Sequence, residues 1–299
     1  MKILGLYARE TLSIMRRVRA PFSVLASRNH HFSLLQIESF NNGITFSADI
    51  TVLSNWRLSA EELEPLEAAT RQRSIVVDCS DPDLIDDDLY RSQLSLASMV
   101  TVPNDWMRAA IKVVNANVWT VPSCVDLPYF VSANSIKLAP DRPLSIGCLG
   151  PYDWYLVKDA ISQILEAHPK AAVLAGLKAF EVLEKHPRIL GINPTVANLP
   201  ELIRNCHIGL CPIDGERGYD DIWRHEYGAL CRPVIAPAPF AKQDTAFWYK
   251  SIEDLLTDNK LRADLGHKAF EEANQQRATK LADRYIAIYR KRLPHLWFS

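Results

Sequence analysis

The 299-residue sequence contains no C-x-x-C pair and no excess of charge of either sign. Its six cysteines are dispersed, most of them inside or beside apolar runs, which predicts reduced, buried thiols rather than a zinc site. The net charge of −1 excludes a global basic field that would draw the chain to nucleic acid or to acidic membranes. We expect no bound metal.

Long apolar runs are also missing. No stretch reaches the roughly 20 apolar residues of a transmembrane helix, and the opening M-K-I-L-G-L-Y is too short for the apolar part of a signal peptide. The composition, 48% hydrophobic and 23% charged, is that of an ordinary globular protein. We therefore expect a soluble, cytoplasmic protein.

Short apolar segments alternate with helical segments along most of the chain. The predicted strands span 3–7, 32–37, 49–53, 74–78, 99–102 and 118–121 in the first half, and 144–149, 171–175, 188–191, 207–211 and 233–236 in the second. Alternation of this kind predicts an α/β fold with parallel sheets and crossover helices.

A proline-rich stretch separates the two halves. Residues 122–143 contain four prolines and show no clear period, which is typical of an interdomain linker. We predict a first domain over 1–122, a linker over 123–143 and a second domain over 144–280. A C-terminal helical segment, 281–299, is expected to cross back to the first domain, and the cleft between domains is the expected ligand site.

The stretch 205–239 concentrates the polar residues expected of a site. It predicts a strand, then a loop with two glycines and many charges, then a helix over 222–231 whose first turns carry Asp220, Asp221, Arg224 and Glu226. Ligands of open α/β sheets bind beyond the carboxyl ends of strands, where loops and helix starts gather. We therefore predict a binding site here.

Six segments resemble, in order, the motifs of GT-B glycosyltransferases, in particular the large retaining, nucleotide-sugar-dependent "glycosyl transferases group 1" family. They are V-W-T-V-P-S-C-V-D (118–126), L-S-I-G-C-L-G (144–150), A-H-P-K-A-A-V-L-A-G (167–176), L-P-E-L-I-R-N-C-H-I-G-L-C-P-I (199–213), H-E-Y-G-A-L-C-R-P-V-I-A (225–236) and S-I-E-D-L-L-T-D-N-K-L-R-A-D-L-G (251–266). The match covers about 99–273, whereas the first hundred residues agree only in general character.

The resemblance implies two Rossmann-like, doubly wound domains facing a cleft. The first lies on the acceptor side, and the second binds a nucleotide-diphosphate sugar as donor substrate. The implied reaction moves the sugar to an acceptor with retention, without a protein nucleophile, a metal or a further cofactor. The acceptor is left open among a saccharide, a lipid, a protein, a small molecule and a nucleic acid.

The resemblance also implies roles for residues of the second domain. Glu226 matches the glutamate that holds the ribose hydroxyls, and a carboxylate can accept two such hydrogen bonds. Arg224 and Arg217 are the implied catalytic cations, because guanidinium binds phosphate oxygens in a bidentate way. The remaining donor-binding candidates are Gly150, Tyr152, Lys158 and Tyr227.

Candidates in the first domain are His31 and Asp78. His31, with His30 beside it, precedes a strand on the side where the family often has a histidine touching the sugar; a polar turn explains it equally well. Asp78 and Asp81 are candidate bases that would activate the acceptor if the reaction inverts. The alternative is that they have structural roles, in a helix cap and a solvated acidic loop. Asp86–Asp88 are interpreted as a solvated helix start.

A basic segment near the N-terminus has two interpretations. Arg16, Arg17 and Arg19 belong to a predicted helix ended by Pro21. In the first, they contact an anionic acceptor or make peripheral contact with a membrane surface. In the second, they form an ordinary exposed helix face.

Several positions depart from the family pattern. Gly218 stands in place of a second glutamate, Pro151-Tyr152 in place of a basic residue, and Cys231 in place of a glycine. Tyr152, Trp154 and Tyr155 either stack on the nucleotide or pack in the core. Because of these departures, two alternative functions stay open. One is an inactive protein that binds a nucleotide sugar or carbohydrate, and the other is a nucleotide-sugar epimerase.

Overall fold

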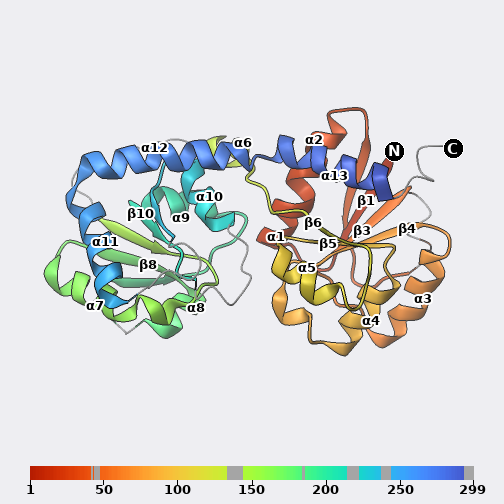
Figure 1. Cartoon of the computed structure of the whole chain (residues 1–299), viewed down its shortest axis with the longest axis horizontal. Coiled ribbons are helices and arrows are strands. Elements are labelled where there is room, and N and C mark those ends of the chain that lie inside the picture. The colour runs from red at the N-terminus through yellow and green to blue at the C-terminus, as the bar shows by residue number, and fades with distance from the viewer. Residues whose placement is uncertain are drawn as a thin grey trace. The chain divides into compact units, whose positions relative to one another are not determined.

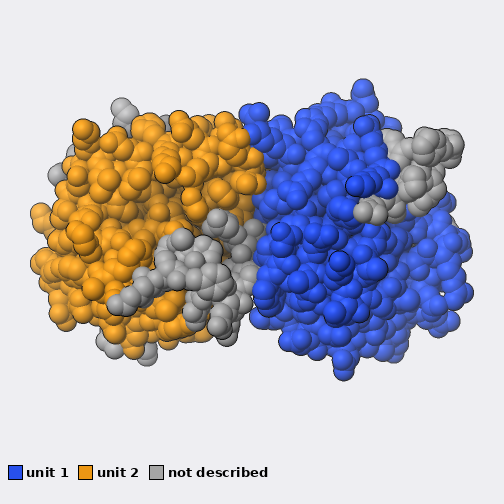
Figure 2. Space-filling view, in the orientation of Figure 1, with its two compact units in different colours: residues 1–124, 277–299 blue, residues 125–276 orange. Residues whose placement is uncertain are grey.

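The computed structural model describes residues 1–41, 43, 48–132, 144–183, 186–213, 222–236 and 244–292. The chain forms two compact units, one made of residues 1–124 and 277–299 and the other of residues 125–276 (Figures 1 and 2). Each unit is built on a parallel sheet with helices, so the predicted α/β fold class is confirmed.

Unit 1 contains a six-stranded parallel sheet in the order β2-β1-β3-β4-β5-β6. Its strands are β1 (Lys2–Tyr7), β2 (His31–Gln36), β3 (Ile50–Ser54), β4 (Ser74–Asp78), β5 (Met99–Val102) and β6 (Val118–Thr120). Its α-helices are α1 (Leu12–Ile14), α2 (Ala20–Ala26), α3 (Ala60–Thr70), α4 (Asp88–Leu96), α5 (Asp105–Ile111) and α13 (Ala278–Arg292), with a 3-10 turn η3 at Pro82–Leu84.

Successive residues of the central strands face opposite sides of this sheet, because strand side chains alternate. Ile75 and Val77 of β4 belong to the core that contains Leu66 of α3 and Leu94 of α4. Val76 belongs instead to a second core, to which α2 and α13 contribute aromatic residues. The sheet is therefore buried on both faces, as expected for an all-parallel sheet.

The C-terminal helix α13 belongs to unit 1 by its packing. Tyr285 lies with its ring centroid 5.0 Å from that of Phe22 on α2, and both rings are buried. The N- and C-terminal parts of the chain thus share one core. Within the predicted linker, Leu127–Ser132 form helix α6 of unit 2, and 133–143 lie outside the described residues.

Unit 2 contains a five-stranded parallel sheet in the order β11-β10-β7-β8-β9. Its strands are β7 (Ser145–Cys148), β8 (Ala172–Gly176), β9 (Ile189–Ile192), β10 (Ile208–Leu210) and β11 (Val234–Ile235). Besides α6, its α-helices are α7 (Lys158–Ala167), α8 (Leu177–Val182), α9 (Leu199–Asn205), α10 (Ile222–Ala229), α11 (Thr245–Thr257) and α12 (Asn259–Gln275), with a 3-10 turn η4 at Trp154–Leu156.

The helical segment after β1 differs from its prediction. A π-helix, η1 (Met15–Arg19), connects α1 to α2, and Pro21 lies in the first turn of α2 rather than at a helix end. The segment stays helical up to Pro21, since Ala20 N–H donates to the Met15 carbonyl, so Pro21 removes one donor from a continuous hydrogen-bond ladder. The Arg17 carbonyl accepts instead from the Tyr285 hydroxyl, at 2.9 Å. Arg16 and Arg17 are 7% and 0% exposed, so the prediction of an exposed basic face is wrong for these two residues.

Candidate functional site

The strand order of unit 2 creates a switch point between β7 and β10. From β7 the chain continues to β8 and β9 on one side, and it then returns to β10 and β11 on the other. The loops that follow β7 and β10 are tied together by a hydrogen bond from Asp153 N–H to the Pro212 carbonyl, at 3.0 Å. Ligands of open α/β sheets bind at such a point.

One face of helix α10 packs against the loop that follows β7. Trp223, Glu226 and Tyr227 share that face because they are three and four residues apart. A side chain added at Gly150, near the start of the loop after β7, would meet the Trp223 ring at 3.2 Å. The face of α10 that carries Glu226 therefore borders the switch point.

Glu226 is fully buried. A buried carboxylate is stable only when hydrogen-bond donors or a positive charge compensate for its lost hydration. Its position on the face of α10 toward the β7 loop is where the resemblance assigns the ribose contact. The preceding residues 214–221 lie outside the described residues, and with them the predicted Arg217 and the glycine at 218.

Tyr227 packs against the sheet. Gly147 of β7 and Gly209 of β10 are paired in register, and together they leave a bare patch on neighbouring strands. The Tyr227 ring covers this patch, since a Cβ at Gly209 would lie 2.8 Å from it. The ring lies on the strands themselves rather than at the loops, so the structure gives Tyr227 a packing role and does not support the predicted donor contact.

The loop after β7 is filled by aromatic rings. Tyr152 and Trp154 are 5% and 1% exposed and meet edge to face, with centroids 5.8 Å apart. Trp154 Nε1 donates to the Gly150 carbonyl at 3.0 Å, and the Tyr152 ring occupies the space beside Gly150. Core packing therefore accounts for both rings, whereas Tyr155 is 57% exposed.

Two cations were predicted near the donor phosphates in the described part of unit 2. Lys158 begins α7, just after this loop, and is half-buried. Arg224 pairs with Glu272 of α12 and thus faces away from the side of α10 that carries Glu226. Of the two, only Lys158 lies at a helix start next to the switch point.

His225, which follows Arg224 on α10, is half-buried. Burial, aided by the neighbouring Arg224 charge, lowers its pKa to about 4. Its Nδ1 is buried and has no hydrogen-bond partner among the described residues. A neutral imidazole results at physiological pH.

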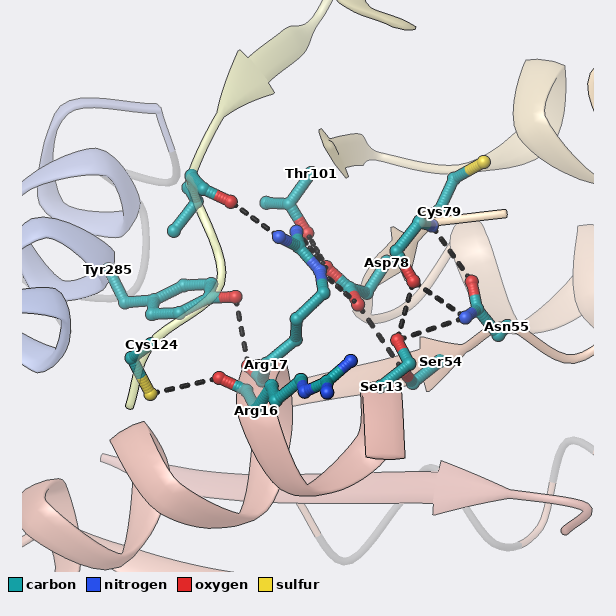
Figure 3. A network of polar contacts seen from close by, with 12 residues as sticks. Ser13, Arg16, Arg17, Ser54, Asn55, Asp78, Cys79, Thr101, Cys124 and Tyr285 are labelled. Atoms are coloured by element: carbon teal, nitrogen blue, oxygen red, sulfur yellow. Dashed lines mark hydrogen bonds and ion pairs between the residues drawn. The ribbon is translucent and has the colours of Figure 1, made fainter. Parts of the chain in front are cut away.

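In unit 1, the carboxyl end of β4 holds a buried ion pair (Figure 3). Arg17 Nε donates to both carboxylate oxygens of Asp78, at 3.1 and 3.0 Å, and Nη2 lies 2.6 Å from Oδ1. Thr101 and Ser54 donate hydroxyl hydrogen bonds to the same carboxylate, at 2.7 and 3.3 Å. Asp78 is therefore fully engaged, which does not support the predicted role as a base.

The π-helix explains how Arg17 reaches this position. The irregular turn directs the Arg17 side chain into the core, where Nη1 donates to the Val121 carbonyl at 2.5 Å. Tyr285 of α13 donates its hydroxyl to the Arg17 carbonyl at 2.9 Å (Figure 3). π-helical turns are rare and often mark such special positions.

Beside this pair lies a network of neutral side chains from α1 and from the loops after β3 and β4 (Figure 3). The Asn55 amide donates to Ser13 Oγ and Ser80 Oγ at 3.0 and 2.6 Å, and the two hydroxyls lie 2.5 Å apart. Asn55 has a φ of 44°, a left-handed conformation that asparagine tolerates better than most residues. The network joins the chain after β1, β3 and β4.

The other unit 1 candidates take different positions. His31 is exposed and begins β2, at the amino end of the strand, so its placement does not support a contact at the carboxyl edge. Asp81 caps the turn η3, and Asp87 caps α4 by accepting from Tyr90 N–H at 2.9 Å. The interpretation of Asp86–Asp88 as a helix start is confirmed for Asp87.

Sequence reasoning missed Ser13, Asn55 and Trp223, and it singled out Arg17 without predicting its buried pair with Asp78. No group of three or more potential metal ligands occurs within the described ranges. In the same part of the chain, no helix is long and apolar enough to cross a membrane. The cysteines are all free, and five are buried as predicted, but Cys231 is exposed.

No protein-family model matches this chain, and no curated protein matches it either. Solved structures do. HepE of Anabaena in complex with UDP-glucose aligns with a TM-score of 0.67 at 12% identity, over 97% of this chain and 100% of that chain. An alpha-glucosyltransferase in complex with UDP and a 13-mer DNA containing a central A:G mismatch aligns with a TM-score of 0.68 at 12% identity, over 96% and 99%.

The chain has the GT-B fold. The predicted GT-B resemblance is thereby confirmed at the level of the fold. UDP-GlcNAc 2-epimerase from Neisseria meningitidis bound to UDP-GlcNAc also aligns, with a TM-score of 0.56 at 10% identity over 97% of this chain and 100% of that chain. Transferases and an epimerase thus share this GT-B architecture, and the choice of reaction must come from the residues.

Proposed function

We propose that this GT-B protein is a glycosyltransferase that moves a sugar from a nucleotide-diphosphate sugar to an acceptor. The supporting observation is the position of Glu226, which shares with Trp223 the face of α10 that borders the β7–β10 switch point. A carboxylate in this position accepts hydrogen bonds from both ribose hydroxyls of a nucleotide.

The diphosphate of the donor lies, in this proposal, beside the β7 loop. Lys158 and the first turn of α7 supply positive charge there, because the N–H groups of a helix start favour anions. Arg217 keeps its proposed role as a second cation. Arg224 is given no role in the reaction because it pairs with Glu272. His31 is given none because it lies at the start of β2.

We propose retention of configuration, with charge on the leaving diphosphate stabilised by these cations and without a metal. The engagement of Asp78 by Arg17 argues against one of the two candidate bases of an inverting reaction, and the resemblance supports retention. The resemblance supports metal independence. Unit 1 is the proposed acceptor side, and the acceptor stays unidentified.

The donor is tested by thermal-shift measurements with UDP, GDP, ADP and their sugars. A ligand that binds only the folded state raises Tm in a concentration-dependent way. We expect one nucleotide series to raise Tm, with the sugar conjugate raising it at least as much as the free diphosphate. Absence of any shift across the panel contradicts the proposal.

An epimerase is the second candidate, favoured by the alignment of the Neisseria meningitidis enzyme over 97% of this chain and 100% of that chain. The two reactions differ in what they require. An epimerase converts the nucleotide sugar with no acceptor present, whereas a transferase releases nucleoside diphosphate at a rate that depends on an acceptor. Chromatography of the nucleotide products separates them.

An inactive nucleotide-sugar-binding protein is the third candidate. The replacement of a basic residue by Pro151-Tyr152, and the packing of Tyr152 into the loop, favour it. It predicts a thermal shift without turnover in either assay. For any of these activities we propose the cytoplasm, where the six free thiols stay reduced.

A further inference from the structure

Three arginines gather at the amino-terminal edge of the unit 2 sheet, opposite the loops after β7 and β10. Arg204 lies in the last turn of α9, before β10, and Arg232 lies between α10 and β11. Arg232 Nη2 donates to the Arg204 carbonyl at 2.9 Å. We call Arg204, Arg232 and Arg262 the arginine cluster.

Arg262 is brought to the other two by helix α12. Gly266, one turn further along the same face of α12, packs directly against the Cys231 carbonyl. The turn that contains Arg232 therefore lies against the Arg262 side of this helix. Burial, together with the charges of Arg204 and Arg262, lowers the pKa of Arg232, which is consistent with this crowding.

Arg232 leaves most of its donors unused. A guanidinium has five N–H donors, and within the described chain Arg232 makes a single hydrogen bond. Its Nε is buried without a partner, although a buried donor of this kind is unfavourable. Neither Arg232 nor Arg262 forms an ion pair with a described residue.

Capping of helix ends explains only part of this arrangement. Arg262 Nη1 donates to the Leu255 carbonyl of α11 at 2.6 Å, and Nη2 contacts Asn259. Such bonds are typical of cations at helix C-termini. The nearest acid, Asp258, caps α12 by accepting from two N–H groups at 2.9 Å. None of these contacts reaches Arg232 Nε or neutralises its charge.

We propose that the arginine cluster binds a small oxyanion of the phosphate class. The planar guanidinium fork matches the spacing of phosphate oxygens, and an anion would satisfy the open donors and offset the repulsion between like charges. Arg204 donates Nη2 to the Phe130 carbonyl at 3.4 Å and contributes charge beside Arg232 rather than open donors. It is only 8% exposed, which favours a small anion over a polymer or a bilayer surface. This site is separate from the proposed donor site.

The test is equilibrium dialysis of the full-length protein against radiolabelled inorganic phosphate, with sodium chloride holding the ionic strength constant. We expect saturable uptake by the wild type and about 10- to 100-fold weaker binding by Arg232→Gln, the loss expected for one hydrogen bond to a charged group. Arg71→Gln is the matched control, because Arg71 is exposed and pairs with Glu67 in unit 1.

Lys158→Gln separates this site from the donor site, because Lys158 is the residue proposed to face the donor diphosphate. It should bind phosphate as the wild type does, whereas loss in Lys158→Gln with retention in Arg232→Gln assigns the phosphate to the donor site and overturns the proposal. Absence of saturable uptake by the wild type also overturns it. If circular dichroism shows that Arg232→Gln is unfolded, Arg262→Gln decides, and unchanged affinity in that variant rejects the cluster.

Discussion

Arg17 and Asp78 form an ion pair in the core of unit 1, with side chains 0% and 1% exposed and Nη2 of one 2.6 Å from Oδ1 of the other. The pair joins the π-helix η1 to the end of β4, and Thr101 completes it from β5. Asp78, at a strand end of unit 1, thus has a structural task, although its position alone suggested chemistry.

Removing one member of this pair should be strongly destabilising. Asp78→Leu leaves the buried Arg17 charge uncompensated, and we expect a loss of about 3–5 kcal/mol in the free energy of unfolding. The double variant Arg17→Met, Asp78→Leu should recover much of this loss, because no buried charge remains. Urea unfolding measures both, and equal losses in the single and double variants contradict a paired structural role.

The Gly147–Gly209 patch makes a second prediction. A Cβ at Gly147 would lie 2.7 Å from Cys206 Sγ and still closer to the Tyr227 hydroxyl, so Gly147→Ala should destabilise unit 2 by about 1–3 kcal/mol. Removing that hydroxyl in the double variant Gly147→Ala, Tyr227→Phe should restore part of the stability. Strictly additive losses in denaturant unfolding would show that the hydroxyl is not the obstacle.

Cys231 offers a stabilising substitution. Helix α10 ends with Arg232 N–H donating to the Tyr227 carbonyl and Cys231 N–H to the Gly228 carbonyl, and Cys231 has a φ of 53°. This is a Schellman motif, whose left-handed position favours glycine. Cys231→Gly should raise the free energy of unfolding by about 0.5–1 kcal/mol, whereas Cys231→Ala, which keeps a Cβ, should bring no gain.

The extent to which the sequence predicts this structure depends on the range of the interactions. The predicted segments 74–78, 99–102 and 199–205 coincide with β4, β5 and α9, because local composition and nearby turn residues define them. The Arg17–Asp78 pair joins residues 61 positions apart through an irregular turn, which no local pattern encodes. Tyr227 could be assigned to packing only once the register had placed Gly147 opposite Gly209.

Glu226 is the residue on which the proposed function depends. Glu226→Gln keeps the shape of the side chain and removes its charge, so we expect nucleotide affinity to fall about 10- to 100-fold with little change in fold. Glu272→Gln is the matched control, since this glutamate lies on α12 and pairs with Arg224. Isothermal titration with the nucleotide that raises Tm tests both, and equal affinities reject the site.

His225 should make the stability of unit 2 fall in acid. Its pKa is about 4 in the folded chain and near 6.5 when unfolded, so the unfolded state binds more protons between these values. Above pH 6.5 the imidazole is neutral in both states and does not change the free energy of unfolding. As the pH falls from 6.5 toward 4, the free energy of unfolding decreases by up to about 3 kcal/mol. His225→Gln removes this titration. Comparing urea unfolding of the two proteins at pH 7 and pH 4.5 isolates the effect, because other groups titrate equally in both, and parallel pH dependences would show that His225 is not the source.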